Sequence, residues 1–575
     1  MLTASGNTIL LTQNTNNLTT LQATAGSLTL SESSDITLYN TNITGTVNIT
    51  AANQISISGS YSAANTLLNN GTLTLASLMT TNLTIAGSGT SANIQTGGNV
   101  TGAAILNSGS LTSNGTFGSL TLNGGTLYTT SNGTTVSGAL AFNSGSVWNA
   151  TGASKTDFSG INTSGPVTIN TAANLTLTAP GNMLYGEGLT LINQSGSSLI
   201  TGNFSGYAQR QKFTNNATPL QINYNGAAGN YLANSSGNDL ILRVATGNIS
   251  VSTPNLTTNA NTSFSGGLQF RVLGGTNNAT GVANVPVSII LPADVTNCNI
   301  ASGRFDNANT SNRSITLYTD SNGNITVPVW ANNNPGPFQV NITQSDDATV
   351  YNYPYMGVVG LAVQRQSINR SFVRYLDIVL NSANMSTLSD NGNITGAALI
   401  TNFANNFTLT QTRTASFTGG ANYTGTAVNF LTQSYTNIYS TPVGFTVDFG
   451  AGGLGNQSST TTYDGVYQLA NTTNANVTVP AYTFHRLLGD ANGDNVVDAL
   501  DNNLIQTVLT TPAWRYQNAS NLTYVNSNMS ATSSNPLAAY NWVGDLNGDG
   551  KINALDLNIA GFQRGRRVNY TRRVT

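Results

Sequence analysis

The chain has 575 residues, a formal net charge of −2 and 7% charged residues, compared with a usual charged share of about 25%. So few charges provide no electrostatic basis for binding nucleic acid or an anionic membrane surface. The single cysteine, Cys298, excludes an internal disulfide framework, and we expect it to be a small buried apolar residue. No apolar run is long enough to span a membrane. Residues 1–12 lack the basic start and apolar core of a signal peptide, so we interpret the sequence as a mature or trimmed form.

The first 244 residues contain a repeated motif that predicts a parallel β-helix. The motif begins at Asn69, Asn107, Asn123 and Asn143 as NNGTL, NSGSL, NGGTL and NSGSV, at spacings of 38, 16 and 20 residues. Short alternating strands lie between Gly and Asn turns, so each rung of roughly 16–20 residues buries its inward side chains against the next. We therefore predict a right-handed parallel β-helix over 1–244. One inward column is expected to contain Leu73, Leu111, Leu127 and Val147.

The charged residues of this region do not indicate catalysis. A polysaccharide-degrading β-helix enzyme needs clustered carboxylates, or a calcium site with a basic residue. Here the acids and bases are scattered, so we predict no catalytic residues and no enzymatic activity. They are Glu32, Asp35, Lys155, Asp157, Glu187, Arg210, Lys212, Asp239 and Arg243. An exposed aromatic row would favour a glycan-binding adhesin, but Tyr128, Trp148 and Tyr185 are too scattered to decide.

Residues 245–357 contain longer strands, which are typical of a β-sandwich. Candidate strands are NVPVSIIL from Asn284, SITLY from Ser314 and NITVPVW from Asn324. The turn at 319–323 is a hairpin-type signal between the last two. The runs VANVPVSIIL and DSNGNITVPVWANNNPGPFQVNIT resemble bacterial Ig-like domains of the invasin type. That resemblance implies a spacer or adhesive module.

Residues 358–486 predict a second β-sandwich. Its candidate strands are YLDIVL from Tyr375, VGFTVDFG from Val443 and GVYQLA from Gly465. We expect the basic cluster at its start to lie on a solvated surface; the cluster is Arg365, Arg370 and Arg374. The only histidine, His485, is expected to pack at the joint with the next segment rather than to act as a catalytic base.

Two stretches near the C-terminus fit twelve-residue calcium loops. They read GDANGDNVVDALDNN from Gly489 and GDLNGDGKINALDLN from Gly544, and the seven acidic residues beyond residue 489 all occupy ligand positions within them. Calcium takes six to eight hard oxygens, which such a loop supplies from alternate side chains and a backbone carbonyl at position 7. We therefore predict two calcium ions. The candidate ligands are Asp490, Asn492, Asp494, Val496, Asp498 and Asp501 in the first loop and Asp545, Asn547, Asp549, Lys551, Asn553 and Asp556 in the second.

Each loop continues into Ala-Leu-Asp and a predicted short helix, near 499–509 and 554–563. This arrangement resembles type I dockerin modules, in which two loop–helix halves are related by a pseudo-twofold axis. The resemblance implies that loop positions 10 and 11 recognise a cohesin-like partner. Here these are Ala499, Leu500, Ala554 and Leu555. The sequence departs from the family at Asn495, where Gly is expected at position 6, and in a longer segment between the halves, about 511–543.

The whole chain, read in order, resembles large secreted proteins of planctomycete type. The order is β-helix (1–244), Ig-like β-sandwich (245–357), second β-sandwich (358–486), small α dockerin-like module (487–567) and basic tail (568–575). We predict an extracellular, cell-surface structural protein that assembles head to tail, its dockerin-like module docking on a β-sandwich of a neighbouring copy or of a cohesin-like partner. An adhesin or glycan-binding protein is the alternative, and a polysaccharide-degrading enzyme is less favoured.

The C-terminal arginines and the glycosylation motifs are two further features of the sequence. Arg566, Arg567, Arg572 and Arg573 are interpreted either as a frayed terminus or as a docking tail that adds a charged rim to the contact. About 35 Asn-X-Ser/Thr motifs lie between Asn17 and Asn569, so covalent glycans are a candidate modification. Composition alone explains many of these motifs.

Overall fold

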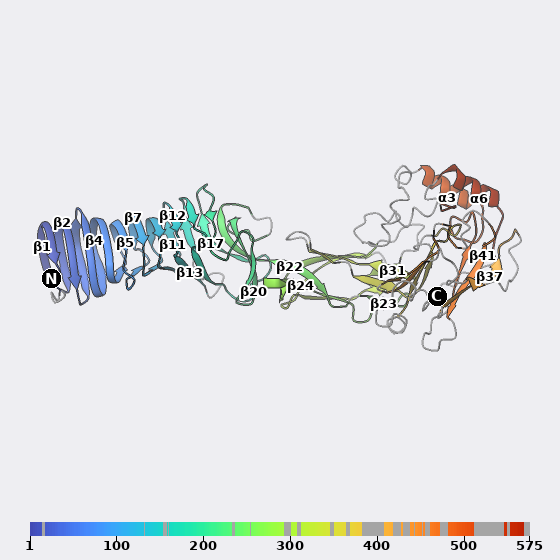
Figure 1. The fold of residues 1–575 in the computed structure, drawn as a ribbon, viewed down its shortest axis with the longest axis horizontal. Coiled ribbons are helices and arrows are strands. Elements are labelled where there is room, and N and C mark those ends of the chain that lie inside the picture. Colours follow the sequence, from blue (N-terminus) through green and yellow to red (C-terminus); the bar gives the residue numbers. More distant parts are fainter. Residues whose placement is uncertain are drawn as a thin grey trace.

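The computed structural model shows an elongated, mainly β molecule, with 55% strand and 6% helix. Figure 1 shows the N-terminal strands at one end of the long axis and the two long helices at the other. The structure describes residues 1–568 except 14–17, 131–132, 153–157, 159, 233–235, 254, 293–300, 307–311, 345–349, 353, 364–367, 382–406, 418–426, 429–436, 442, 451, 455–460, 472–480, 511–544 and 549–552. Cys298, Lys155, Asp157, Arg365, Arg572 and Arg573 lie outside the described residues.

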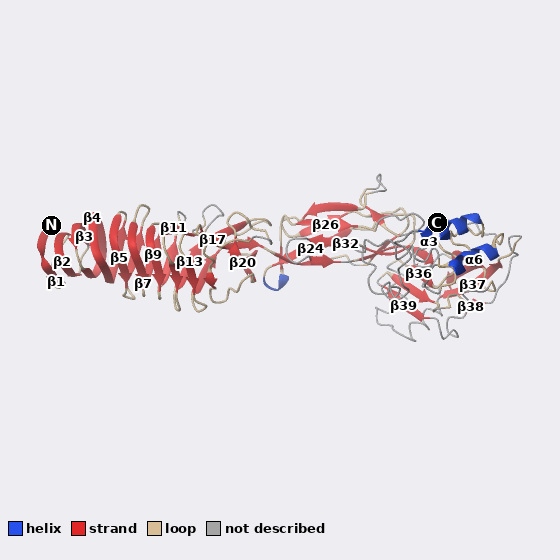
Figure 2. Ribbon diagram, turned by 90° about the horizontal axis from the view of Figure 1, so that it is seen from above, coloured by secondary structure: helices blue, strands red, loops and turns tan. Residues whose placement is uncertain are grey.

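The N-terminal part is a parallel β-solenoid of about seven turns, which confirms the predicted parallel β-helix. Its strands stack in succession along the long axis (Figure 2). They are β1 (Leu2–Leu11), β2 (Thr20–Glu32), β3 (Ile36–Ile43), β4 (Thr46–Leu75), β5 (Leu78–Ile85), β6 (Ser91–Ile94), β7 (Asn99–Leu106), β8 (Ser110–Ser113), β9 (Thr116–Leu122), β10 (Thr126–Thr129), β11 (Thr134–Val136), β12 (Leu140–Phe142), β13 (Val147–Thr151), β14 (Ile161–Thr163), β15 (Val167–Ile169), β16 (Asn174–Thr178), β17 (Gly188–Gln194) and β18 (Thr201–Gly202).

One buried column runs through the solenoid and explains the uneven motif spacing. Leu73 pairs with Ala92, Ala92 with Leu111, and Leu111 with Leu127. The rung that contains Ala92 has no NxGxL motif, so the interval of 38 residues between Asn69 and Asn107 covers two rungs. Asparagine side chains form a ladder on the outside: Asn123 donates to Asn107 at 2.9 Å and Asn143 donates to Asn123 at 2.7 Å.

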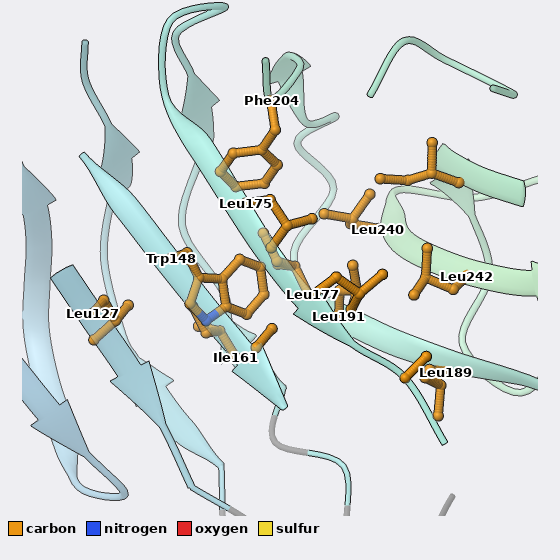
Figure 3. Packing of buried hydrophobic residues seen from close by; sticks show 14 of the residues in the cluster. Leu127, Trp148, Ile161, Leu175, Leu177, Leu189, Leu191, Phe204, Leu240 and Leu242 are labelled. Atoms are coloured by element: carbon orange, nitrogen blue, oxygen red, sulfur yellow. The ribbon is translucent and has the colours of Figure 1, made fainter. Parts of the chain in front are cut away.

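The predicted inward position of Val147 is wrong by one residue. Leu127 pairs with Trp148, which is fully buried, whereas Val147 pairs with Thr126 and is partly exposed. The turn here contains one extra residue, because the inward position follows Asn143 by five residues whereas it follows Asn123 by four. Ser146 within this turn is buried, and its hydroxyl donates to the Asn143 carbonyl at 2.7 Å. Trp148 therefore takes the inward position next to Leu127 (Figure 3). Its ring N–H donates to the Thr129 hydroxyl at 3.1 Å.

The solenoid ends in antiparallel strands that pack on the next region. These are β19 (Lys212–Asn215), β20 (Thr218–Gly226) and β21 (Asp239–Val244), and β21 pairs with β17 and β20. The buried cluster that begins at Ile9 continues without a break to Val358. Thr214 and Thr276 exchange backbone-to-hydroxyl hydrogen bonds of 3.2 and 3.1 Å across this joint. Two of the scattered charges are structural here: Arg243 is buried against Gln221, and buried Asp239 accepts the Gln194 N–H at 2.6 Å.

The middle β region, from 246 to 358, is formed by small and mostly antiparallel sheets. Its elements are β22 (Thr246–Val251), β23 (Leu256–Thr258), β24 (Leu268–Gly274), the 3-10 turn η1 (Thr276–Asn278), β25 (Thr280–Gly281), β26 (Pro286–Ile290), β27 (Gly303–Arg304), β28 (Ser314–Tyr318), β29 (Asn324–Val327), β30 (Trp330–Ala331), β31 (Gly336–Gln339), β32 (Asn341–Gln344), β33 (Val350–Asn352) and β34 (Tyr355–Val358).

The turn at 319–323 is a corner between two sheets and does not form the predicted hairpin. β28 pairs with β26, whereas β29 pairs with β24. The Asp320 carboxylate accepts the backbone N–H groups of Asn322 and Asn324, each at 2.8 Å. Asx turns of this kind turn a chain locally and do not specify which strand it pairs with next.

The C-terminal β region, from 360 to 486, has its own core and two four-stranded sheets. One sheet contains β35 (Gly360–Val363), β36 (Tyr375–Val379), β40 (Gly444–Asp448) and β39 (Asn437–Thr441). The other contains β38 (Ala427–Val428), β37 (Phe407–Thr414), β41 (Gly465–Asn471) and β42 (Tyr482–Arg486). The predicted strands from Tyr375, Val443 and Gly465 are therefore present. Arg374 is ion-paired with Asp448 at 2.7 Å, so the basic cluster is not simply solvated.

Candidate calcium-binding loops

Two helices follow the two candidate loops, as the sequence predicts. They are α3 (Ala499–Thr510) and α6 (Ala554–Gln563), and they lie beside each other on the outside of the C-terminal β region (Figure 1). A small core holds the halves together. It contains Ala491, Ile505, Leu546 and Ala560, all fully buried. Each half contributes one loop residue and one helix residue to this core, so the halves are matched in packing as well as in sequence.

The carboxylates at loop positions 1 and 12 are bonded in the same way in both loops. Asp490 accepts the N–H of Gly493 at 2.6 Å, and Asp545 accepts that of Gly548 at 2.7 Å. Asp501 at position 12 accepts the N–H groups of Ala491 and Asp498 at 2.7 and 2.8 Å. Its counterpart Asp556 does the same with Leu546 and Asn553, at 2.8 and 2.9 Å.

These residues also start the helices. The Asn553 side chain accepts the Leu555 N–H at 2.7 Å while Asp556 accepts the Asn553 N–H, which is a complete capping box. In the first loop Asp498 accepts the Leu500 N–H at 2.6 Å, and Asp501 accepts the Asp498 N–H at 2.8 Å. Caps of this kind each contribute about 1 kcal/mol to helix stability. The ligand pattern and the helix start are therefore encoded by the same side chains.

The departure at Asn495 is accommodated by the backbone. Asn495 has φ of 71°, in the left-handed region, and its N–H donates to Asp490 at 3.0 Å. Asparagine adopts this region more readily than other residues with a β-carbon. The loop at position 6 thus has the turn that glycine would supply. Gly493 and Gly548, at position 4 of each loop, have φ of 74° and 73°.

The remaining candidate ligands of the first loop lie in short local turns. Asn492 donates its side-chain amide to Asp494 at 2.9 Å, and Asp494 accepts the Val496 N–H at 3.0 Å. In the second loop Asn547 is partly buried, whereas Asp549 and Lys551 lie outside the described residues. Within the described ranges, no group of three or more His, Cys, Asp or Glu side chains is arranged to hold a metal ion. The first-loop carboxylates accept N–H groups of their own loop instead.

Burial and charge repulsion of the first-loop carboxylates nevertheless fit a bound cation. Burial, and secondarily the nearby charge of Asp490, raise the pKa of Asp501 to about 7. Burial also raises the pKa of Asp494, with smaller contributions from Asp490 and Asp498. The pKa of a carboxyl group rises in this way when the negative charge of its ionised form is poorly compensated. A donor set made only of oxygens, carrying excess negative charge in a tight loop, is the chemistry that calcium selects.

His485 lies at the joint, as predicted, and also has a partner that the sequence did not indicate. Its ring Nε2 lies 2.7 Å from a carboxylate oxygen of Asp490, and both side chains are buried. The pairing follows from β42 ending directly against the first loop. No local sequence signal identified it, because spacing alone does not show which way the chain turns after Arg486.

The arginines after α6 are not a free tail where the structure describes them. Arg566 is buried and is ion-paired with Asp464 of the C-terminal β region, and Arg486 is bonded to the same carboxylate at 2.8 Å. The backbone of Arg567 exchanges hydrogen bonds of 2.9 and 3.0 Å with Ser416. Arg566 therefore closes a buried cluster and does not rim an external contact. The predicted tail, 568–575, is described only at Val568.

The predicted partner-binding residues lie at equivalent exposed positions. Leu500 and Leu555 are 58% and 51% exposed, and Ala499 and Ala554 are exposed beside them. Phe562 on α6 is 84% exposed, an apolar residue that the sequence analysis did not single out although it lies on a predicted helix. These five exposed apolar residues of α3 and α6 are called the apolar face here.

Among the described residues, no helix is both long and apolar enough to cross a membrane. Comparison with protein-family models, curated proteins and solved structures gave no match to this chain, so the functional argument depends on its own residues.

Proposed function

We propose that this chain is an extracellular structural protein that binds two calcium ions and assembles through its C-terminal loop–helix pair. The loop–helix pair corresponds to a dockerin-like module, and the middle and C-terminal β regions correspond to two β-sandwiches, as in secreted proteins of planctomycete type. The observation that carries the proposal is the matched pair of loops, which presents Leu500 and Leu555 at equivalent exposed positions.

In this proposal the calcium ions neutralise the buried carboxylates and fix the starts of both helices. The four position-1 and position-12 carboxylates are buried: Asp490, Asp501, Asp545 and Asp556. Buried ionised groups are stable only when they are paired or bound to a metal. With the loops fixed, the apolar face has one defined shape, which a docking surface requires.

The solenoid serves as a rod in this assembly. Its core is continuous with that of the middle β region, so rod and first spacer behave as one packed body. The partner of the apolar face is a β-sandwich of a neighbouring copy or of a cohesin-like protein, and a heterologous contact between copies extends into a filament or lattice. Asn-linked glycans on the rod are compatible with this role.

The test is assembly of the full chain in calcium, followed by electron microscopy and light scattering. We expect Leu500→Arg with Leu555→Arg to abolish polymers or partner binding while the stoichiometry of bound calcium is unchanged. The matched control is Leu199→Arg with Leu232→Arg, since these leucines are 58% and 43% exposed elsewhere. Normal assembly of the variant with Leu500→Arg and Leu555→Arg would show that the apolar face is not the contact between assembled molecules. Release of sugar from a polysaccharide by the wild-type chain would favour an enzyme instead.

A further inference from the structure

A short segment of the C-terminal β region crosses both candidate loops. This segment, residues 368–372, is called the strap here, and it lies between β35 and β36. It contacts loops that are more than 100 residues away in the sequence. Asn369, Ser371 and Phe372 within it are buried. The strap is therefore an internal part of the joint and not a surface loop.

The strap binds the backbone of both loops at position 1. The N–H groups of Arg370 and Ser371 donate to the carbonyl oxygen of Asp490, at 3.0 and 3.1 Å. The side-chain amide of Asn369 donates to the carbonyl oxygen of Asp545, at 2.9 Å. Position 1 supplies the first carboxylate ligand of each loop, so the strap contacts the same residues that a calcium ion would bind.

A single hydroxyl joins the two halves. The Ser371 Oγ accepts the N–H of Gly489 at 2.9 Å, just before the first loop, and donates to the carbonyl of Leu546 at 2.8 Å in the second. Both bonds are fully buried. An unpaired buried N–H or carbonyl is costly, so the halves lose these bonds together if the strap leaves.

The position-4 glycines fit the strap by their shape. A β-carbon on Gly493 would lie 2.3 Å from the carbonyl oxygen of Ile368, and one on Gly548 would lie 2.3 Å from the ring of Phe372. Both distances are far below van der Waals contact. Both loops therefore approach the strap closely at position 4, one against its backbone at Ile368 and the other against the ring of Phe372.

A second segment, residues 565–568, also binds the backbone of the first loop. Gly565 donates to the Val497 carbonyl, and Val497 donates to the Arg566 carbonyl, both at 2.8 Å. Val568 donates to the carbonyl of Asn495 at 3.1 Å. Because this segment also pairs with Ser416, the first loop is connected to the C-terminal β region through two separate segments.

We infer that the two calcium loops act as a clasp on the chain's own C-terminal β region, so that calcium binding and seating of the strap are one coupled equilibrium. The inference rests on the calcium binding proposed above and adds an intramolecular partner to it. An ion that orders position 1 orders the carbonyl that the strap binds, and the strap in turn pre-orders the loop for the ion. Such coupling is reciprocal by thermodynamic necessity.

The first test is hydrogen exchange of the full chain in calcium and in a calcium chelator. We expect the peptide that contains the Arg370 and Ser371 amides to exchange at least tenfold faster in chelator. A peptide covering β8 to β10 of the solenoid is the internal control and should not change. Equal exchange of the strap in both conditions would overturn the clasp.

The second test measures calcium affinity by titration calorimetry on Ser371→Ala, a change that leaves every candidate ligand intact. Loss of its two hydrogen bonds should weaken calcium binding about three- to tenfold. Ser314→Ala, at an exposed serine of β28, is the matched control and should bind as the wild type does. Asn369→Ala should weaken binding in the same direction.

These measurements separate the clasp from the calcium proposal. A wild-type chain that binds two calcium ions without any change in strap exchange, and whose affinity is unaltered by Ser371→Ala, would disprove the clasp and leave the calcium sites standing. A chain that binds no calcium would disprove both.

Discussion

The solenoid and the C-terminal joint are stabilised in opposite ways. In the solenoid each rung contacts its sequence neighbours, and partners such as Leu111 and Leu127 are separated by one rung. At the joint, Asn369 and Ser371 bind loop residues 176 and 175 positions away. The first arrangement is built mainly from apolar stacking and the second from buried hydrogen bonds and ion pairs.

This difference predicts different responses to damage. A solenoid is close to a one-dimensional array, so its stability is the sum of rung and neighbour terms and a defect acts locally. The joint closes a long chain segment through a few polar contacts, so the loss of any one weakens the others. The following four variants test this contrast, from the largest expected effect to the smallest.

A charge within the apolar column should have the largest effect. Leu127 is fully buried between Leu111 and Trp148, so Leu127→Asp leaves an unpaired carboxylate in the stack. We expect a loss of about 4 kcal/mol or more, measured by denaturant unfolding, with new protease cleavage confined to the neighbouring rungs. Tyr128→Asp is the matched control, since Tyr128 points outward and is 40% exposed. Equal losses from the two variants would mean that the column is misplaced.

Disruption of the buried ion cluster at the joint, formed by Asp464, Arg486 and Arg566, should have the second-largest effect. Arg566→Gln leaves buried Asp464 with Arg486 as its one remaining ion-pair partner among the described residues. Removing one partner from a buried pair costs about 3 kcal/mol or more. The unfolding transition of the C-terminal β region should shift while that of the solenoid stays in place. Arg564→Gln, at an exposed arginine two residues earlier, should shift neither. If both variants behave alike, the cluster does not stabilise the joint.

Calcium should stabilise the joint and leave the solenoid unaffected. At a concentration about ten times its dissociation constant, a ligand specific to the folded state adds about 1.4 kcal/mol per site, or about 2.8 kcal/mol for the two sites together. Asp490→Ala with Asp545→Ala should reduce the bound calcium from two ions to none and abolish this stabilisation. Thermal unfolding with and without chelator, together with calcium titration, measures both effects. Asp320→Ala, which removes an aspartate outside the loops, is the control; an unchanged stoichiometry in the double variant would refute the site.

The same contrast explains what the sequence could predict. Local patterns identified the solenoid, inner strands of the two C-terminal sheets and both loop–helix halves, because each depends on residues within one rung, one strand or one loop. Trp148 was missed because a single extra turn residue, Ser146, moves the register without changing the motif. The strap was missed because no local pattern marks a serine that binds a carbonyl 175 residues away. The sequence analysis treated Asn495 as a departure from the loop pattern, yet its backbone has the left-handed conformation that glycine would adopt at position 6.

A change at Asp320, in the turn at 319–323, should give the smallest effect. This turn is also held by backbone N–H groups that donate to a carboxylate, but unlike the loop carboxylates Asp320 is exposed. Backbone N–H groups of Asn324 and Asn322 hold the pKa of Asp320 below its ordinary value of 3.8, chiefly through Asn324. A depressed carboxyl pKa stabilises the folded state above the unfolded pKa, and the contribution is lost as the pH falls below about 4. Solvent screens this exposed group, so the gain is small. Amide exchange at Asn322 and Asn324 should therefore be slower in the wild type than in Asp320→Asn at pH 7, and the ratio of the two rates should move toward one as the pH is lowered below 4. A ratio that stays constant with pH would show that the carboxylate charge does not hold this corner.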